Sequence, residues 1–192
     1  MNNFQIKFKK PLKAFTLIEL LVVISIIALL TGILMPVIGK ARGAAKSTVC
    51  KSNLRSLAAG FRMYLDDNRE TFPPAIATPS LYGKYGLIPI PDANFNLSQY
   101  GITNYLSRYI KDPKTYKCPA DKKEYYFRLE GTSYRYNQML ANRTLSKLRL
   151  SLKQTNVMND FQPWHGTGIA GKPGSENYLY ADWHIGDLTG DP

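Results

Sequence analysis

Apolar residues are concentrated in one run near the start of the chain. From Phe15 to Ile38 almost every residue is apolar, and Glu19 is the only charged residue among them. A bilayer-spanning helix needs about 20 such residues, so this run predicts a transmembrane helix over 15–38. Lysines at positions 7, 9, 10 and 13 precede it, and such positive charge is expected to stay on the cytoplasmic side. Residues 1–14 therefore form a basic leader ahead of the span.

Beyond the span, apolar residues recur at helical spacing. They are separated by 4, 3, 4 and 3 residues, which places them on one stripe of a helix: Cys50, Leu54, Leu57, Phe61 and Tyr64. Basic residues occupy another face: Lys51, Arg55, Arg62 and Arg69. The pattern predicts an amphipathic stem helix over 39–70 that packs its apolar stripe on a head domain.

Pro36 falls inside this helical pattern, between Gly32 and Gly39. A proline within a helix removes one backbone hydrogen bond and kinks or locally melts the helix. The alternative is that these three residues only mark the end of the membrane span.

The remainder, 71–192, predicts a globular head. The segment 71–91 holds five prolines and is expected to be an irregular connector. A short helix is predicted over 97–110. Strands are predicted from their β-branched and aromatic residues, over 125–129, 133–137, 156–159 and 177–185. A long helix packed on a small antiparallel sheet is an α+β fold.

The net charge and the cysteine content exclude few functions. The formal net charge is +11, a charge that can attract nucleic acid or anionic surfaces. A solvated protein surface is the favoured interpretation of this charge. Two cysteines, Cys50 and Cys118, cannot make a structural zinc site alone. If the head is exported they lie in an oxidising compartment, where a disulfide between them is expected. The alternative is two buried thiols acting as small apolar residues.

Glu19 is the exception within the apolar run. A carboxylate in hydrocarbon costs roughly 2.5–3.5 kcal/mol on insertion scales, so such residues are usually paired and functional. The alternative is that Glu19 lies close enough to the helix end to reach the interface. Position alone leaves both interpretations open.

The segment Lys13-Ala14-Phe15-Thr16-Leu17-Ile18-Glu19-Leu20 resembles the processing motif of type IV prepilins. The resemblance implies that a prepilin peptidase cuts between Ala14 and Phe15 and methylates the new amine. It also implies that Glu19 pairs with the N-terminal amine of a neighbouring subunit. The family usually has glycine before the cut; alanine is also small, so cleavage is still expected, although more slowly.

The head is similar to a group of pilin-like proteins from planctomycete- and verrucomicrobia-type bacteria. The resemblance is carried by Cys50-Lys51-Ser52-Asn53-Leu54-Arg55, by Phe72-Pro73-Pro74 and by Tyr116-Lys117-Cys118-Pro119. That group ends with a histidine followed nine residues later by Asp-Gly. Here 16 residues separate His165 from Asp182, and Trp183 stands where the glycine would be.

Little in the sequence indicates catalysis. An enzyme would have to gather His165, Asp182, His184 and Asp160 at one site, yet the chain contains no nucleophile motif, no H-E-x-x-H and no phosphate-binding glycine loop. We expect no enzyme and no cofactor, with one exception. Some major pseudopilins hold calcium in a C-terminal loop, and carboxylate oxygens for Ca²⁺ could come from Asp182, Asp187 and Asp191.

Together the patterns predict a pseudopilin: a structural subunit of a type II secretion or type IV pilus-like system. Its expected partners are the prepilin peptidase, other pilin-like subunits and the inner membrane, with a single pass and the head in the periplasm. The alternative is a pilus-tip module that binds DNA or a surface through the basic face; nucleic acid is not favoured.

Overall fold

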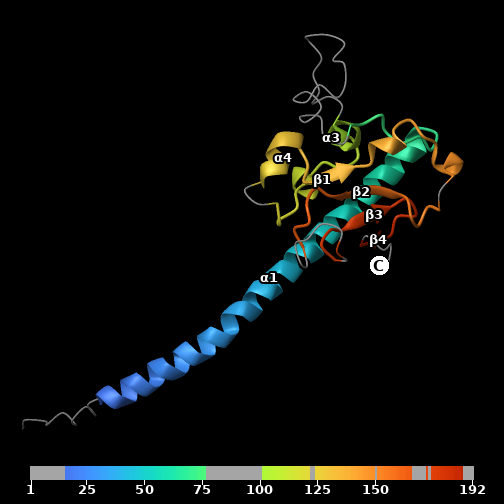
Figure 1. Cartoon of the computed structure of the whole chain (residues 1–192). Coiled ribbons are helices and arrows are strands. Elements are labelled where there is room, and N and C mark those ends of the chain that lie inside the picture. Colours follow the sequence, from blue (N-terminus) through green and yellow to red (C-terminus); the bar gives the residue numbers. More distant parts are fainter. Residues whose placement is uncertain are drawn as a thin grey trace, which may run out of the picture. The chain divides into compact units, whose positions relative to one another are not determined.

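The computed structural model of this chain describes residues 16–76, 101–121, 124–149, 151–165, 172 and 174–187. The chain divides into two compact units, Met1–Ala41 and Arg42–Pro192. The first unit holds the apolar run, and the second holds the head (Figure 1).

Helix α1, Leu17–Asp67, begins in the first unit and ends in the second. Pro36 lies inside it, and the helix continues through this residue. The helix ends at Asp67, inside the predicted stem segment 39–70. Arg69 and Glu70 adopt left-handed backbone conformations, with φ of 54° and 56°, and the Glu70 amide donates to the Leu65 carbonyl at 2.8 Å. This reversal closes the last turn of the helix.

The second half of α1 buries the first four residues of the predicted apolar stripe, and the fifth, Tyr64, is partly buried against the core. Cys50, Leu54, Leu57 and Phe61 are all fully buried, and Leu65 is 3% exposed. The Phe61 ring stacks on the ring of Tyr136 from the sheet, with centroids 5.9 Å apart. Burying a large apolar side chain contributes roughly 1.5–3 kcal/mol, so this stripe is a main source of head stability.

The head sheet has four antiparallel strands in the order β1-β2-β3-β4. Its members are β1 Tyr134–Tyr136, β2 Asn156–Asp160, β3 Tyr178–Tyr180 and β4 Ile185–Gly186. Tyr134 pairs with Asp160 across β1 and β2. The hydrophobic core contains residues of both the sheet and α1, which confirms the predicted α+β fold.

The strand predicted over 125–129 is wrong, because these residues form helix α4, Tyr125–Glu130. Its aromatic residues favour a strand locally, but tertiary contacts override that preference. The Asp121 carboxylate accepts from the Phe127 amide at 3.0 Å. Gly131 closes the other end at φ 74°, a conformation that favours glycine.

The single strand predicted over 177–185 is also wrong, since β3 and β4 are two strands of a hairpin. Asp182 and His184 therefore lie in the turn between these two strands. Trp183 has φ 73° in this turn, where a glycine would be expected. The strands predicted over 133–137 and 156–159 are confirmed as β1 and β2.

Short helices complete the head. The helix predicted over 97–110 is reduced to α3, Ile102–Leu106; residues 97–100 lie outside the described residues. Within the described residues, three 3₁₀ helices follow: η2 Pro113–Tyr116, η4 Gln138–Leu140 and η5 Leu145–Lys147.

Candidate functional site

The helix start near the predicted processing point is held by a reciprocal pair of polar side chains. The Thr16 amide and hydroxyl donate to Glu19 Oε2 at 2.8 and 2.7 Å, and the Glu19 amide donates to Thr16 Oγ1 at 3.3 Å. This is a capping box, which satisfies two amides of the first turn. The Thr-x-x-Glu spacing was the sequence signal for it. Ala14 and Phe15, where cleavage is predicted, lie outside the described residues.

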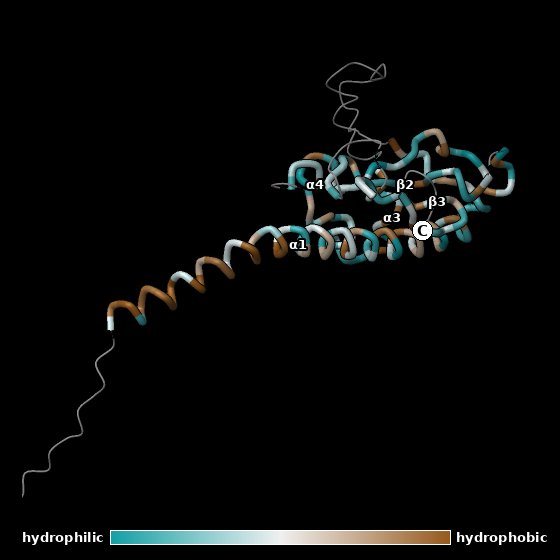
Figure 2. The backbone as a smooth tube through the Cα atoms, turned by 60° about the horizontal axis from the view of Figure 1, so that its bottom comes forward, coloured by the Kyte–Doolittle hydropathy of each residue, from teal (hydrophilic) through white to brown (hydrophobic). Residues whose placement is uncertain are grey.

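The first unit exposes an apolar helical surface. Large apolar side chains from Leu17 to Ile38 are exposed, from 83% at Leu17 to 40% at Ile38, and Figure 2 shows this half of α1 as almost continuously hydrophobic. Among the described helices, α1 alone is long and apolar enough to cross a membrane. A contiguous apolar surface of this kind marks a site of contact with lipid or protein.

Cys50 and Cys118 are joined by a disulfide, the pairing that the sequence predicts, with Cα atoms 5.2 Å apart. Both residues are fully buried. The bond ties α1 to the segment that follows η2. Asn53 supports the same contact, because its side-chain amide donates to the Lys117 carbonyl at 2.8 Å.

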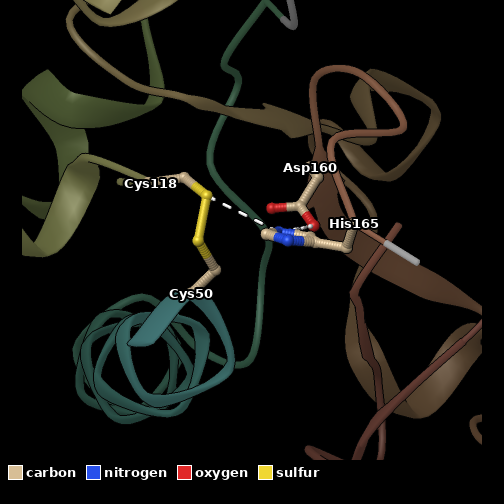
Figure 3. A group of neighbouring side chains, drawn as sticks. All are labelled: Cys50, Cys118, Asp160 and His165. Carbon is tan, nitrogen blue, oxygen red and sulfur yellow. Dashed lines mark hydrogen bonds and ion pairs between the residues drawn. A yellow bond between two sulfur atoms is a disulfide. The ribbon is translucent and has the colours of Figure 1, made fainter. Parts of the chain in front are cut away.

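A buried acid–histidine pair lies against this disulfide (Figure 3). His165 Nε2 is 3.2 Å from Asp160 Oδ2 and 3.6 Å from Cys118 Sγ. Asp160 is fully buried and His165 is 3% exposed. The sequence places His165 in a motif with Asp182, but the structure pairs it with Asp160, at the end of β2.

Asn177 fixes the orientation of Asp160. Its backbone amide and its side-chain amide donate to Asp160 Oδ2 at 2.7 and 2.8 Å. Burial raises the pKa of Asp160, while His165 and Asn177 act in the opposite direction. Two buried atoms, Asp160 Oδ1 and His165 Nδ1, have no hydrogen-bond partner among the described residues. Such unsatisfied buried groups are rare enough to require an explanation.

Asp182 and His184 form a second, more exposed pair. His184 Nδ1 is 2.5 Å from Asp182 Oδ1, which also accepts from the His184 amide. Together with Trp183 they line a surface groove against α1. The Arg62 guanidinium lies over the Trp183 ring, 5.5 Å from its centroid, a distance at which a cation is attracted to the ring face. The four residues weighed for catalysis thus form two separate pairs.

The described residues do not test the calcium hypothesis. Asp182 pairs with His184, and Asp187 is the last residue of the described C-terminal segment. Asp191 lies outside the described residues. The single group of three or more metal-ligating side chains within the described part of the chain surrounds the disulfide. Calcium binding by these three aspartates stays a prediction.

Comparison with known proteins agrees with the geometry of α1. Residues 10–35 match the family model described as the prokaryotic N-terminal methylation motif. A stretch of 106 residues is 30% identical to the type II secretion system core protein G of Pseudomonas aeruginosa, covering 55% of this chain and 70% of that protein. No solved structure matches the chain significantly.

Proposed function

This chain belongs to the type IV pilin-like family as a pseudopilin-like subunit, and from this premise we propose how it is processed, anchored and assembled. One observation carries the proposal: the methylation motif over residues 10–35 overlaps an exposed apolar half-helix whose first turn holds the single carboxylate of the run. Members of the family are structural subunits. The alternative of a DNA- or surface-binding tip module has no support in the comparisons.

The proposed processing step is cleavage between Ala14 and Phe15, followed by methylation of the Phe15 amine. It is supported by the motif match, which spans the predicted cut. The test is mass spectrometry of protein extracted from membranes. We expect an N-terminal peptide that begins with methyl-Phe15; intact Met1, or a cut beyond Ile38, would reject the step. Ala14→Gly restores the usual family residue and is expected to be cleaved at least as fast.

The proposed location is the inner membrane, with α1 crossing once and the head in the periplasm. The exposed apolar side chains between Leu17 and Ile38 support it, because water would otherwise contact them. The disulfide in the head fits an oxidising compartment. Protease added to spheroplasts should degrade the head, whereas a head that resists until the membrane is lysed contradicts this orientation.

Assembly is proposed to use Glu19. The Glu19 carboxylate accepts both hydrogen bonds from Thr16 through Oε2, so within the described residues Oε1 is left for a further donor. The methylated amine of a neighbouring subunit would supply a charge-assisted hydrogen bond there. This partner also accounts for a carboxylate within an apolar helix.

Two variants separate the capping role of Glu19 from its charge. Glutamine serves equally in a capping box, so Glu19→Gln keeps the helix start and loses only the ionic partner. Glu19→Ala loses both. We expect normal insertion and cleavage but reduced fibre yield in both variants, measured by shearing and immunoblotting. Full assembly by Glu19→Gln would show that capping alone matters and would reject the pairing.

A further inference from the structure

Four buried side chains converge around the disulfide: Cys50, Cys118, Asp160 and His165. One ligand-type atom from each lies within 4.8 Å of all the others. The four come from different parts of the fold, namely α1, the segment after η2, the end of β2 and the loop beyond it, and Figure 3 shows Asp160 and His165 directed toward the sulfur atoms. This cluster belongs to neither the processing site nor the assembly site.

The donor atoms form a set that suits zinc. Structural Zn²⁺ sites are tetrahedral and use cysteine sulfur, histidine nitrogen and carboxylate oxygen at about 2.0–2.3 Å. From these bond lengths, tetrahedral ligands lie about 3.5 Å apart for sulfur and nitrogen and about 3.3 Å apart for nitrogen and oxygen. The observed distances are 3.6 Å from Cys118 Sγ to His165 Nε2 and 3.2 Å from His165 Nε2 to Asp160 Oδ2. Two edges of a tetrahedron are therefore already present.

For a metal to bind, the distance between the two sulfur atoms must increase. In the oxidised protein the sulfurs are covalently bonded, whereas two thiolates on one zinc lie about 3.8 Å apart. Reduction by an added phosphine breaks the S–S bond: the phosphine gives two electrons and becomes the phosphine oxide, water supplies the oxygen and two protons, and two thiols result. Metal binding then releases those two protons, because the ligands are thiolates.

We propose that the reduced head binds one zinc-class divalent cation through Cys50, Cys118, His165 and Asp160, so that disulfide and metal are alternative occupants of one site. The same carboxylate offers a second oxygen, because Asp160 Oδ1 is buried without a partner among the described residues, whereas Oδ2 is the oxygen that forms the edge with His165. Asn177 supplies the outer layer of such a site, since its two N–H donors hold the Asp160 carboxylate.

The experiment uses the full chain in detergent. Because both cysteines are fully buried, the disulfide is reduced with a phosphine in urea, and the protein is refolded without oxygen in the presence of Co²⁺. Cobalt replaces zinc in tetrahedral sites and reports thiolate ligands through intense visible bands and a near-ultraviolet charge-transfer band. We expect one cobalt per chain with these bands, displacement by Zn²⁺, and no such bands in the oxidised protein.

Matched variants identify the ligands. His165→Ala and Asp160→Ala are first checked for folding in the oxidised state by circular dichroism and trypsin resistance. If His165→Ala does not fold, His165→Gln is used in its place. Zn²⁺ affinity is measured by competition with a chromophoric chelator. Each variant is expected to bind Zn²⁺ at least about tenfold more weakly, because even the loss of a residue that only supports a ligand weakens metal affinity by about that much. His184→Ala, outside the cluster, should bind as the parent does. Absence of cobalt uptake by the reduced protein, or equal affinity in the parent and His165→Ala, would overturn the proposal.

Discussion

Gly60 of α1 lies close to the Ile110 side chain, and its replacement by alanine tests that contact. A Cβ atom at Gly60 would lie 2.4 Å from Ile110 Cδ1 and 2.7 Å from Ile110 Cγ1. Real Cβ contacts essentially never come below 3.0 Å, so Ile110 would have to move. The Cδ1 atom ends a flexible side chain, but Cγ1 lies closer to the backbone and cannot move without a change of rotamer.

Two opposing terms decide the sign of the effect. Alanine is favoured over glycine by about 1 kcal/mol within a helix. Overpacking a well-packed contact costs about 1–3 kcal/mol. Gly60→Ala should therefore lower the free energy of unfolding by about 0–2 kcal/mol. Gly43 offers the matched control in the same helix, because a Cβ there would meet nothing within 4 Å, and Gly43→Ala should be neutral or stabilising by up to about 1 kcal/mol.

The assay is denaturant unfolding of the full chain in detergent, followed by the fluorescence of Trp164 and Trp183. A third variant, Ile110→Ala, removes the clashing atoms, and in its background Gly60→Ala should become stabilising. The coupling between the two positions should amount to about 1–3 kcal/mol, within the range of contacting residues. If Gly60→Ala stabilises the head as much as Gly43→Ala does, the close approach to Ile110 is refuted.

Three further predictions concern the head. Replacing Cys50 and Cys118 together by serine opens a loop of sequence separation 68 and should lower the free energy of unfolding by about 4 kcal/mol on chain-entropy estimates, measured by denaturation; an unchanged midpoint would contradict it. Tyr136→Phe removes a hydroxyl that donates to the Pro73 carbonyl at 3.1 Å and should lower the free energy of unfolding by about 1 kcal/mol. Tyr116→Phe removes a buried hydroxyl with no partner among the described residues and should be neutral or stabilising. A larger loss of stability in Tyr116→Phe than in Tyr136→Phe would refute the contact with Pro73. Burial raises the pKa of Tyr116 to about 12; since the unfolded chain releases this proton near pH 10, stability should be full below that pH and fall as the pH rises toward 12, with a shallower fall in Tyr116→Phe.

Long, strongly periodic features were predictable from the sequence. The apolar run and the stripe beginning at Cys50 specify α1 because burial follows helical spacing over many residues. The segment 125–129 was mispredicted because its helix depends on Asp121, which contacts Phe127 only in the folded head. The turn at Trp183 was missed because a tryptophan with positive φ carries no turn signal in the sequence.

The cluster around the disulfide was also predictable only in part. The sequence suggests that Cys50 and Cys118 meet, because one lies on the buried stripe and the other before a proline. It does not suggest that Asp160 is the partner of His165, since the family motif directs attention to Asp182. Asp160 reaches its position through the register of β2, in which it pairs with Tyr134. Strand register depends on the whole sheet and cannot be read from the spacing of two residues.

The position of Cys50 along α1 has a mechanical consequence. Counted from the N-terminal end of the helix, it is the first buried residue, ahead of Leu54, Leu57 and Phe61. A pulling force applied to the membrane half of α1 therefore reaches the covalent bond to Cys118 before it reaches any of these apolar contacts. Peeling the helix off the sheet from that end would require breaking a covalent bond, so the disulfide shields the non-covalent core from tension along the helix.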